Sequence, residues 1–418
     1  MALSSIVRKI RMWGLKGILG YFRARLENRR WHRYFAKNSR LLKGEPVRGI
    51  TVVGALSSQG SVHKSLRDFC YSLKDVGVPF QTFDLGRHEV PLADIQSILT
   101  PREEFRINKY THLVEMLSSP VQNGLVPHRG RIVFWEFEDG IVEAYPTLVE
   151  RSGDVLAMSD FNYEYYRSEF SGRRAVRKIL YPLRLDVSQV HEKEICRARW
   201  GLKKDEFVVF YNFSYASGWN RKNPLSVVQT FAKAFRDDSQ ARLILKTASR
   251  SAYEENAEKV ERCAREEGIL DRVTFVDEYL SQAELYDLTN ACDVYLSLHR
   301  SEGFGLGIAE AMMLGKAVVV TAYSAPLEFC NSENSILVPY EMVKVDCSDV
   351  PWYASASQWA EPNVDVAAAA LKRLRMDPEL LKKLGDNACR TLKDRFSLDN
   401  FLKSLLSYLD ESSKEGAC

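Results

Sequence analysis

The sequence has few of the features that would assign it to a membrane span, a nucleic-acid complex or an oxidising compartment. No stretch approaches the roughly 20 consecutive apolar residues that a membrane-spanning helix needs. The formal net charge of the 418 residues is +3 at pH 7, which gives no indication of nucleic-acid binding. None of the eight cysteines forms a C-x-x-C pair or stands near a histidine at zinc spacing, so we interpret them as reduced thiols of a cytosolic protein.

The signatures of several enzyme classes are absent as well. The sequence has no D-x-D motif after a predicted strand, no H-E-x-x-H and no G-x-S-x-G, so we expect neither a metal ion nor a serine nucleophile. It also has no internal repeat, no low-complexity tract and no secretory signal with a small-residue cleavage site. Its 45% hydrophobic and 27% charged residues are typical of a globular protein, and the length allows two or three domains.

The positive charge is concentrated at the amino-terminal end. Residues 1–50 hold 13 lysines and arginines and 2 acids, whereas the rest of the chain holds 45 and 53, a net of −8. We predict a basic amphipathic helical extension over residues 1–45, and we favour its attachment to an anionic membrane surface. Packing on the protein's own body and an organelle transit peptide are the alternatives. The apolar positions at helical spacing are Leu15, Ile18, Leu19, Phe22 and Leu26.

The most informative stretch is Ser301–Glu310, which reads S-E-G-F-G-L-G-I-A-E. It follows a predicted buried strand at Val294–Leu298 and leads into a predicted helix, so we expect a strand, a glycine-rich turn and a helix start. Glycines at alternate positions, 303, 305 and 307, let a ligand approach the backbone closely. The unpaired N–H groups of a helix start suit a phosphate.

Two glutamates, Glu302 and Glu310, bracket this turn. A carboxylate accepts two hydrogen bonds and can therefore hold a sugar diol. A ligand with a diphosphate in its middle and a sugar at each end would meet both acids. The alternatives are that Glu310 is an acid placed favourably in the helix dipole and that the glycines form a tight turn and nothing more.

Residues 299–321, H-R-S-E-G-F-G-L-G-I-A-E-A-M-M-L-G-K-A-V-V-V-T, resemble the E-x7-E signature of the family 4 (group 1) retaining glycosyltransferases, of the bacterial surface-polysaccharide type. The resemblance implies an α/β protein with the GT-B fold, in which two Rossmann-like doubly wound parallel-sheet domains face each other across a cleft. It implies that Glu302 contacts the donor sugar as a catalytic residue and that Glu310 holds the ribose. The turn that donates N–H groups to the sugar and phosphate consists of Gly303, Phe304, Gly305, Leu306 and Gly307.

The first Rossmann-like domain is predicted to span residues 46–183. Its first strand, Ile50–Val53, is followed by the loop G-A-L-S-S-Q-G-S and a helix over Val62–Asp75. In the family this loop lies over the cleft and often carries a Gly-x-Gly-Glu turn. This chain has Gln59, Gly60 and Ser61 there instead. We therefore expect Gly60 and Ser61 to lie at the acceptor side of the cleft, in a loop without an acid.

A second candidate for the acceptor side is the strand predicted at Arg131–Phe137, which reads R-I-V-F-W-E-F. A subset of the family has a similar W-x-W-E stretch at this place. Glu136 is then expected to reach the acceptor hydroxyl. Two interpretations of Trp135 stay open, a platform for a sugar face and an ordinary core residue.

The second domain, predicted over residues 184–390, opens with a strand at Phe207–Phe213 and the sequence Y-A-S-G-W-N-R-K-N-P. The resemblance implies that Arg221, Lys222 and Lys246 neutralise the nucleotide diphosphate, because fixed cations stabilise the charge of the leaving group. Many relatives carry an arginine about six residues before the lysine, where this chain has Ser214. A solvated basic loop is the alternative for Arg221.

Two further segments complete the predicted architecture. The loop D-E-Y-L is expected to embrace the nucleotide base, with Tyr279 either stacking on the base or packing in the core. Residues 391–418 are predicted to form a terminal helix that crosses back to the first domain, over about Leu398–Leu409. Ser281 and Glu284 have the spacing of a capping box, which predicts a helix start between these two elements.

The resulting expectation is a metal-independent, retaining hexosyltransferase that uses no cofactor besides its donor substrate. It would move a hexose or deoxyhexose, of the mannose or rhamnose type, from a nucleotide diphosphate sugar to a glycan or lipid-linked acceptor in polysaccharide or O-antigen biosynthesis. It would work in the cytoplasm, with the inner face of the cell membrane as a site of attachment. A nucleotide-sugar epimerase of GT-B shape and a non-catalytic nucleotide-binding scaffold at the membrane are the alternatives.

One prediction concerns the lysine at the end of the strand Arg242–Lys246. If Lys246 neutralises the diphosphate, the substitution Lys246→Ala should weaken the binding of a free nucleoside diphosphate about tenfold or more, since a charge-assisted hydrogen bond contributes about 1.5–3 kcal/mol. Isothermal titration calorimetry measures this affinity. An unchanged dissociation constant would remove Lys246 from the site.

Overall fold

The computed structural model describes residues 29–42, 44–116, 121, 125–145, 153–185, 190–346, 353 and 356–415. The amphipathic stretch of the amino-terminal extension falls on residues 1–28 and lies outside this part, so its attachment to a membrane stays a prediction. Among the described residues, no helix combines the length and the apolar character that crossing a membrane requires.

The first unit is a sheet of six strands, each parallel to its neighbours, in the order β2-β1-β3-β4-β5-β6. Most of these strands are buried, but their sequences also carry polar residues: the strand at residues 128–132 reads H-R-G-R-I, and its buried Arg129 and Arg131 pair with the buried Glu115 of the neighbouring strand. They are β1 (Val47–Gly54), β2 (Phe80–Asp84), β3 (Tyr110–Met116), β4 (His128–Ile132), β5 (Asp154–Ala157) and β6 (Val176–Lys178). The helices of this unit are α2 (Ser61–Asp75), α3 (Leu92–Ile95), α4 (Ile141–Ala144) and α6 (Asp160–Glu169).

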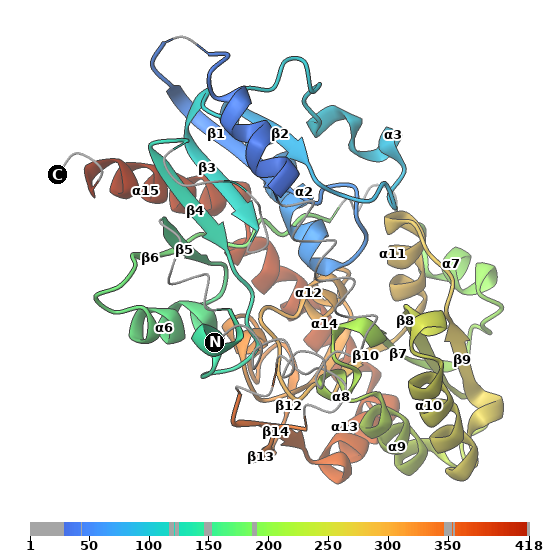
Figure 1. Ribbon diagram of the computed structural model, residues 1–418. Helices are drawn as coiled ribbons and strands as arrows, with labels where there is room; N and C mark the ends of the chain where they lie inside the picture. Colours follow the sequence, from blue (N-terminus) through green and yellow to red (C-terminus); the bar gives the residue numbers. More distant parts are fainter. Residues whose placement is uncertain are drawn as a thin grey trace.

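The second unit is a parallel sheet in the order β12-β11-β10-β7-β8-β9, which is the strand order of the Rossmann fold. Its strands are β7 (Phe207–Ser214), β8 (Ala241–Ala248), β9 (Val273–Val276), β10 (Val294–Ser297), β11 (Ala317–Thr321) and β12 (Ile336–Val338). Its helices are α7 (Lys193–Arg199), α8 (Trp219–Lys222), α9 (Pro224–Phe235), α10 (Glu254–Glu266), α11 (Gln282–Ala291), α12 (Leu306–Met313), α13 (Val364–Met376) and α14 (Pro378–Arg395). The predicted fold of two parallel α/β domains is therefore confirmed (Figure 1).

Several helix ends follow from local chemistry that the sequence makes visible. The capping box before α11 is present, with the Ser281 hydroxyl accepting from the Glu284 N–H and the Glu284 carboxylate accepting from the Ser281 N–H. Pro224 occupies the first turn of α9, where its missing N–H costs nothing. Gly77 follows α2 with a φ of +70°, a conformation that favours glycine.

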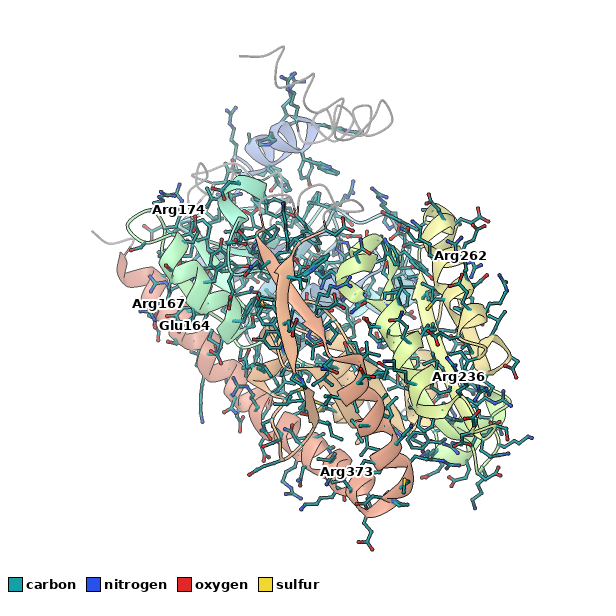
Figure 2. The ribbon with its side chains drawn as sticks, turned by 90° about the horizontal axis from the view of Figure 1, so that it is seen from below. Glu164, Arg167, Arg174, Arg236, Arg262 and Arg373 are labelled. Carbon is teal, nitrogen blue, oxygen red and sulfur yellow. The ribbon has the colours of Figure 1, made fainter. Side chains whose placement is uncertain are left out.

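A short antiparallel hairpin was not predicted from the sequence. It consists of β13 (Tyr340–Lys344) and β14 (Gln358–Pro362), paired from Tyr340 with Pro362 to Lys344 with Gln358. The view from below shows this hairpin near the middle of the molecule, while labelled arginines such as Arg236, Arg262 and Arg373 extend from the surrounding helices (Figure 2). The hairpin is attached to the second unit, but its side chains reach the first.

The two units share buried apolar surface at this hairpin. One core cluster joins Trp135 and Phe137, which follow β4, to Val345, Tyr353 and Trp359 of the hairpin segment. The Phe137 and Tyr353 rings lie 4.7 Å apart at 69°, the edge-to-face arrangement that aromatic pairs prefer. The hairpin therefore holds the second unit against the first by ordinary hydrophobic packing.

Residues 29–38 form a helix that packs on the first unit. Phe35 is fully buried and lies 4.9 Å from Phe83 and 6.3 Å from Phe105, measured between ring centroids. Trp31 lies 5.3 Å from Phe83, and the Asn38 amide donates to the Phe105 carbonyl at 3.0 Å. For this part of the extension, packing on the protein's own body is the arrangement that the structure has.

The last helix, α15 (Leu398–Glu415), crosses from the second unit to the first (Figure 1). The Ser404 hydroxyl accepts from the Leu180 N–H at 2.9 Å, and Phe401 lies 5.8 Å from Phe69 of α2. Two exposed carboxylates near its end pair with the first sheet, Asp410 with Arg48 at 2.7 Å and Glu411 with Arg177 at 2.8 Å. The sheet of the first domain is thus covered by the end of the chain.

The strand predicted at Arg131–Phe137 is wrong at both ends, because the observed strand β4 spans His128–Ile132. Its last residue, Ile132, pairs with Leu156 of β5, and the Val133 N–H still donates to the Leu156 carbonyl at 3.2 Å. Residues 134–138 continue past the carboxyl edge of the sheet as a loop. Trp135 and Glu136 therefore belong to a loop at the carboxyl edge, which is where a parallel sheet binds ligands.

The docking of α15 gives a prediction about pH. His112 of β3 is 1% exposed, stacks on His128 at 4.7 Å and lies 2.9 Å from the Ser412 hydroxyl of α15. Burial lowers the pKa of His112 from 6.5 to about 4. Between these values the unfolded chain binds a proton that the folded chain does not, so the free energy of unfolding should fall as the pH drops from 6.5 towards 4.

Chemical denaturation at several pH values measures this loss. The variant His112→Gln keeps a polar side chain without a titrating group, so its unfolding free energy should vary less steeply over the same pH range. His63, His128 and the buried His299, whose pKa values burial also lowers, remain in the variant and contribute to the residual slope. Equal slopes in the two proteins would show that His112 is not the proton-binding group.

Candidate active site

The candidate site lies where the strand order of the second sheet reverses. In an open parallel sheet, ligands bind at the carboxyl ends of the strands, at the place where neighbouring connections leave in opposite directions. In the second sheet this place is between β7 and β10. The loop after β7 carries Arg221 and Lys222, and the loop after β10 carries Glu302. The topology therefore brings together two predicted site segments that are about 80 residues apart.

The Arg221 side chain holds the loop after β10 in place. It is 2% exposed, and all three of its guanidinium nitrogens donate hydrogen bonds. Nη1 donates to the Ser301 carbonyl at 2.6 Å, Nη2 to the Ser217 carbonyl at 2.8 Å and Nε to the Tyr353 hydroxyl at 3.1 Å. The alternative of a solvated basic loop is therefore wrong for Arg221, whose donors are already used by the protein.

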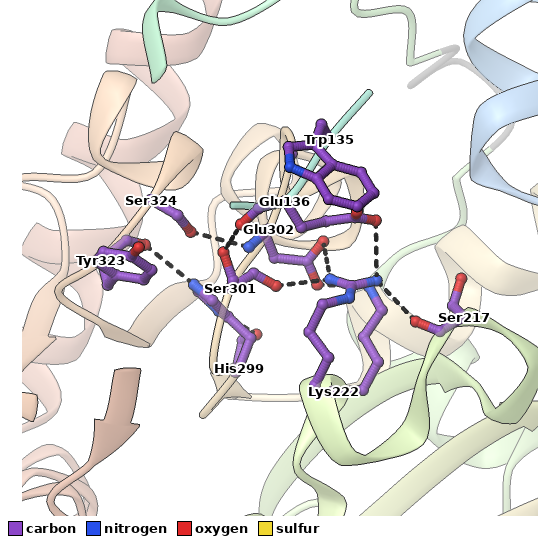
Figure 3. A network of polar contacts seen from close by, with 12 residues as sticks. Trp135, Glu136, Ser217, Lys222, His299, Ser301, Glu302, Tyr323 and Ser324 are labelled. Atoms are coloured by element: carbon purple, nitrogen blue, oxygen red, sulfur yellow. Dashed lines mark hydrogen bonds and ion pairs between the residues drawn. The ribbon is translucent and has the colours of Figure 1, made fainter. Parts of the chain in front are cut away.

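The same guanidinium lies between two carboxylates from different domains. Glu136 of the first domain is 3.4 Å from Nη2, and Glu302 of the second domain is 3.2 Å from Nη1. The Ser301 hydroxyl also donates to the Glu136 carbonyl (Figure 3). Burial raises the pKa of the Glu136 carboxyl, while the Arg221 charge opposes the rise. Arg221 thus joins the predicted acceptor side to the predicted donor side.

Glu302 is held in its ionised form. Its side chain is 12% exposed and pairs with Lys222 as well as with Arg221. Burial by itself would raise the pKa of Glu302, but the Lys222 and Arg221 charges outweigh burial and hold the pKa at about 2. The carboxylate therefore stays an acceptor of hydrogen bonds at any physiological pH. Figure 3 shows Glu302 and Lys222 facing each other within this network.

The glycine-rich turn has the expected strand–turn–helix form, and its glycines have identifiable reasons. Gly305 has a φ of +88°, in the left-handed region, and a Cβ there would lie 2.9 Å from Pro326. A Cβ on Gly307 would lie 2.5 Å from both the Asn212 Oδ1 and the Tyr295 hydroxyl. The second of these glycines therefore serves the packing of α12 against β7 and β10, a reason that the sequence does not reveal.

The first half of the turn is pressed against the first domain. The Gly303 carbonyl accepts from the Ser159 hydroxyl at 3.0 Å, and a Cβ on Gly303 would come within 3.3 Å of the Trp135 carbonyl. The Phe304 ring is 4% exposed and stacks on Tyr181 at 3.9 Å and 12°. Tyr181 belongs to the segment that joins the two domains, residues 180–190, which we call the linker. Phe304 therefore anchors the turn to the linker, which is a packing role.

The helix α12 starts in the site and carries the second glutamate. Its first turn begins at Leu306 and has no side-chain cap, so its leading N–H groups stay available to a ligand. The Glu310 carboxyl is 7% exposed and has three polar neighbours, Lys64 Nζ at 3.5 Å, the Tyr286 hydroxyl at 3.3 Å and the Gln282 amide at 3.4 Å. Burial raises its pKa, and the Lys64 charge opposes the rise.

On the acceptor side the structure favours the core interpretation of Trp135. The side chain is 1% exposed, its ring is in contact with Phe137, Tyr145 and Tyr353, and its Nε1 donates to the Asp139 carbonyl at 2.7 Å. The ring thus has no open face for a sugar, which corrects the platform hypothesis. Its burial follows from the hairpin that covers it.

The loop before α2 is open. Gly60 and Ser61 are both exposed, and Gly60 has a φ of +108° at the uncapped start of this helix. Both residues therefore lie at the surface, where a ligand could reach them. Their contact with an acceptor stays a prediction.

Three predicted donor-side residues lie outside the contacts just described. Lys246, on β8, donates to the Thr247 carbonyl at 2.5 Å, and no described contact joins it to Glu302 or Glu310. Burial lowers its pKa, opposed by Asp277.

The Ser214 hydroxyl accepts from the Ala216 N–H at 3.3 Å and so caps the turn after β7. Tyr279 is 53% exposed, which excludes the core alternative for this residue.

A cavity of about 540 Å³ lies at the amino edge of the second sheet, away from these residues. Lys193, Arg197 and Asp293 are part of its lining. Asp293 pairs with Lys193 at 2.6 Å and with Arg197 at 2.7 Å, so both of these cations already share a carboxylate partner. Within the described residues, no group of three potential metal ligands is placed to hold an ion.

Sequence reasoning missed several residues of the site. Lys64 and Asp68, one helical turn apart on α2, form a pair at 2.5 Å that faces Glu310; the i, i+4 spacing of opposite charges was a usable signal. Tyr353, which holds Arg221, gave no signal because it follows the hairpin strand β13 in an irregular segment. Sequence reasoning also missed Ser324, whose hydroxyl accepts a hydrogen bond from the Glu302 N–H at 2.9 Å.

The burial of Arg221 gives a prediction about stability. Replacing it by methionine, which has a similar length, leaves Glu136 and Glu302 without their shared cation. Breaking a buried ion pair on one side costs about 3–5 kcal/mol, so Arg221→Met should reduce the free energy of unfolding by about that amount in chemical denaturation. Adding Glu136→Gln should recover part of the loss. A change below about 1 kcal/mol would contradict the assigned role.

The chain resembles known proteins in part of its sequence and in its fold. Residues 192–343 match the family model described as glycosyl transferases group 1. No curated protein matches the chain in sequence.

Solved structures match over most of the chain. Sucrose-phosphate synthase from Thermosynechococcus elongatus has 17% identity and a TM-score of 0.63, covering 89% of this chain and 100% of its own. A glycosyltransferase from Rickettsia africae ESF-5 has 16% identity and a TM-score of 0.62 with the same coverage, 89% and 100%. Anabaena HepE in complex with UDP and glucose has 15% identity and a TM-score of 0.60, covering 87% and 100%. At such identities the likeness shows the fold, so the chain has the GT-B fold, and its residues 192–343 are similar to the group 1 glycosyltransferases.

Proposed function

We propose that the protein is a retaining, metal-independent glycosyltransferase. Its donor is a nucleotide diphosphate sugar carrying a hexose or deoxyhexose of the mannose or rhamnose type, and its acceptor is a glycan or a lipid-linked glycan of polysaccharide or O-antigen biosynthesis. The observation that carries the proposal is the uncapped start of α12 between two buried glutamates, Glu302 and Glu310, at the domain boundary. The UDP and glucose named with Anabaena HepE support a nucleotide sugar as the donor.

The donor fits this arrangement from its nucleotide to its sugar. The ribose diol would donate to Glu310, the diphosphate would accept from the leading N–H groups of α12, and the sugar hydroxyls would donate to Glu302. Of the two cations that pair with Glu302, Lys222 has the more open side chain, 17% exposed against 2% for Arg221. Its ammonium would stabilise the charge of the departing diphosphate, which grows in the transition state.

The reaction needs no protein nucleophile in this proposal. The bond between the anomeric carbon and the phosphate oxygen breaks, the acceptor oxygen bonds to the anomeric carbon on the same face, and the departing phosphate oxygen takes the acceptor's proton. Glu136 supports the acceptor side, because Arg221 holds its carboxylate next to Glu302. The shared guanidinium would thus set the separation between the reacting sugar and the incoming hydroxyl.

The proposed place of action is the cytoplasm, at the inner face of the cell membrane. What supports attachment is the charge of residues 1–50, with 13 basic residues against 2 acids, since anionic lipids attract such segments.

The donor proposal is tested by a thermal-unfolding panel with UDP, GDP and dTDP, followed by their sugars. A ligand at about 100 times its Kd stabilises the folded state by about 2.7 kcal/mol, which raises the melting temperature measurably. We expect one nucleoside diphosphate to stabilise the protein at concentrations where the other two do not. Stabilisation by none of the three would contradict the proposal.

The catalytic prediction concerns Glu302. The assay uses the nucleotide sugar that stabilises the protein in the thermal-unfolding panel, together with an acceptor. In this assay Glu302→Ala should lower the rate of sugar transfer by about 10²-fold or more, which is the usual effect of removing one positioned electrostatic group. Circular dichroism should show an unchanged fold. Glu333→Ala, which removes an exposed glutamate of the same domain, is the matched control and should keep its activity. Wild-type turnover in Glu302→Ala would refute the role.

A further inference from the structure

Lys64 makes a contact between the two domains that the proposed chemistry does not use. It belongs to the first domain, one turn into α2, and is 9% exposed. Its Nζ lies 2.5 Å from the Asp68 carboxylate on the same helix, 3.5 Å from the Glu310 carboxylate of the second domain and 3.4 Å from the Arg184 carbonyl of the linker. Figure 1 shows α2 directly above α12, the helix that carries Glu310.

We propose that Lys64 is a positioning residue for the nucleotide, which keeps the Glu310 carboxyl ionised and aimed at the ribose across the domain boundary. The inference rests on the proposed donor site. Lys64 does not touch the reacting atoms; it acts through Glu310.

The chemical reason is the protonation state that a diol requires. Two vicinal hydroxyls can both donate to a carboxylate, whereas a protonated carboxyl group has lost one of these acceptors. The Glu310 side chain is 7% exposed, and taking a charge out of water favours the protonated form. Burial indeed raises the pKa of Glu310, the Lys64 charge lowers it and the Asp68 charge raises it again.

The other groups around Glu310 do not replace Lys64. Those described there are neutral at physiological pH, apart from Asp68, which is an acid. They come from α11, the linker and β10, and they are Gln282, Tyr286, Tyr181 and Tyr295. Lys64 is therefore the cation that balances Glu310.

Asp68 explains how Lys64 keeps its place when a nucleotide arrives. A ribose diol would replace the Lys64 ammonium at one oxygen of Glu310. Lys64 would keep its 2.5 Å contact with Asp68, so the positive charge stays near the carboxylate without occupying it. The arrangement thus allows the ligand to bind without leaving a buried ammonium unpaired.

The test compares the pH dependence of nucleotide affinity in wild type and in Lys64→Met. Calorimetric titrations from pH 6 to pH 9 would use the nucleoside diphosphate, UDP, GDP or dTDP, that stabilises the wild-type protein. Loss of Lys64 raises the pKa of Glu310. Each unit by which this pKa lies above the pH of the solution lowers the ionised fraction of Glu310 about tenfold. We expect Lys64→Met to bind at least about tenfold more weakly than wild type at pH 6 and to recover to within about threefold at pH 9.

Two further variants make the test independent of the folding of Lys64→Met. Lys64→Arg keeps the charge and should keep the wild-type pH profile. Asp68→Asn removes the acid that raises the pKa of Glu310, so the loss of affinity on the acidic side should move to lower pH than in wild type, the opposite direction from Lys64→Met.

Lys178→Met is the matched control. Lys178, on β6, forms a different ion pair between the domains, with Glu328 at 3.4 Å, and its loss should leave the pH profile of nucleotide binding unchanged. Equal profiles in wild type, Lys64→Met and Asp68→Asn would overturn the inference while leaving the donor proposal intact. A wild-type protein that binds none of the three nucleotides would overturn both.

Discussion

A single buried guanidinium fixes the geometry on which the site depends. Arg221 is 2% exposed, and burying such a charge would be prohibitive without partners. The chain supplies five partner groups, namely the carbonyls of Ser217 and Ser301, the hydroxyl of Tyr353 and the carboxylates of Glu136 and Glu302. The partners of Arg221 come together only when the two domains and the hairpin segment are assembled. The geometry of the site therefore depends on how the two domains are packed against each other.

The two halves of the molecule meet at the carboxyl edges of their sheets. At this boundary the Ser159 hydroxyl holds the Gly303 carbonyl, Tyr181 stacks on Phe304, and Lys64 reaches Glu310. Each contact joins the glycine-rich turn or α12 to the first domain or the linker. The turn that we assign to the donor is therefore positioned by both domains, and a movement of one domain relative to the other would change the site directly.

Much of this architecture was predictable from local pattern. Several strands of the second sheet, such as β7, β10 and β11, are largely apolar runs, and the capping box at Ser281 and the turn at Ser301–Glu310 have sequence signatures with a local physical cause. The amino-terminal half of the extension is still a prediction, since it falls outside the described residues. Local sequence pattern therefore predicted the order of the elements and the position of the glycine-rich turn.

The remaining features depend on contacts between distant parts of the chain. Trp135 is covered by a hairpin more than 200 residues later, so its burial was not visible locally. Arg221 was predicted to neutralise a diphosphate, with a solvated loop as the alternative, because its partners Tyr353 and Glu136 are remote in the sequence. Lys246 has the right sequence environment, yet β8 carries it one strand away from the reversal of strand order between β7 and β10.

The central claim is that a nucleotide diphosphate sugar binds between the domains, against the start of α12. Amide hydrogen exchange with and without the stabilising nucleoside diphosphate locates the bound ligand most directly, because it reports the opening of each segment separately. The account predicts slower exchange over residues 303–309, at the uncapped helix start, and over the loop before α2. Unchanged exchange at 303–309 together with slower exchange over residues 193–207, at the opposite edge of the second sheet, would contradict it.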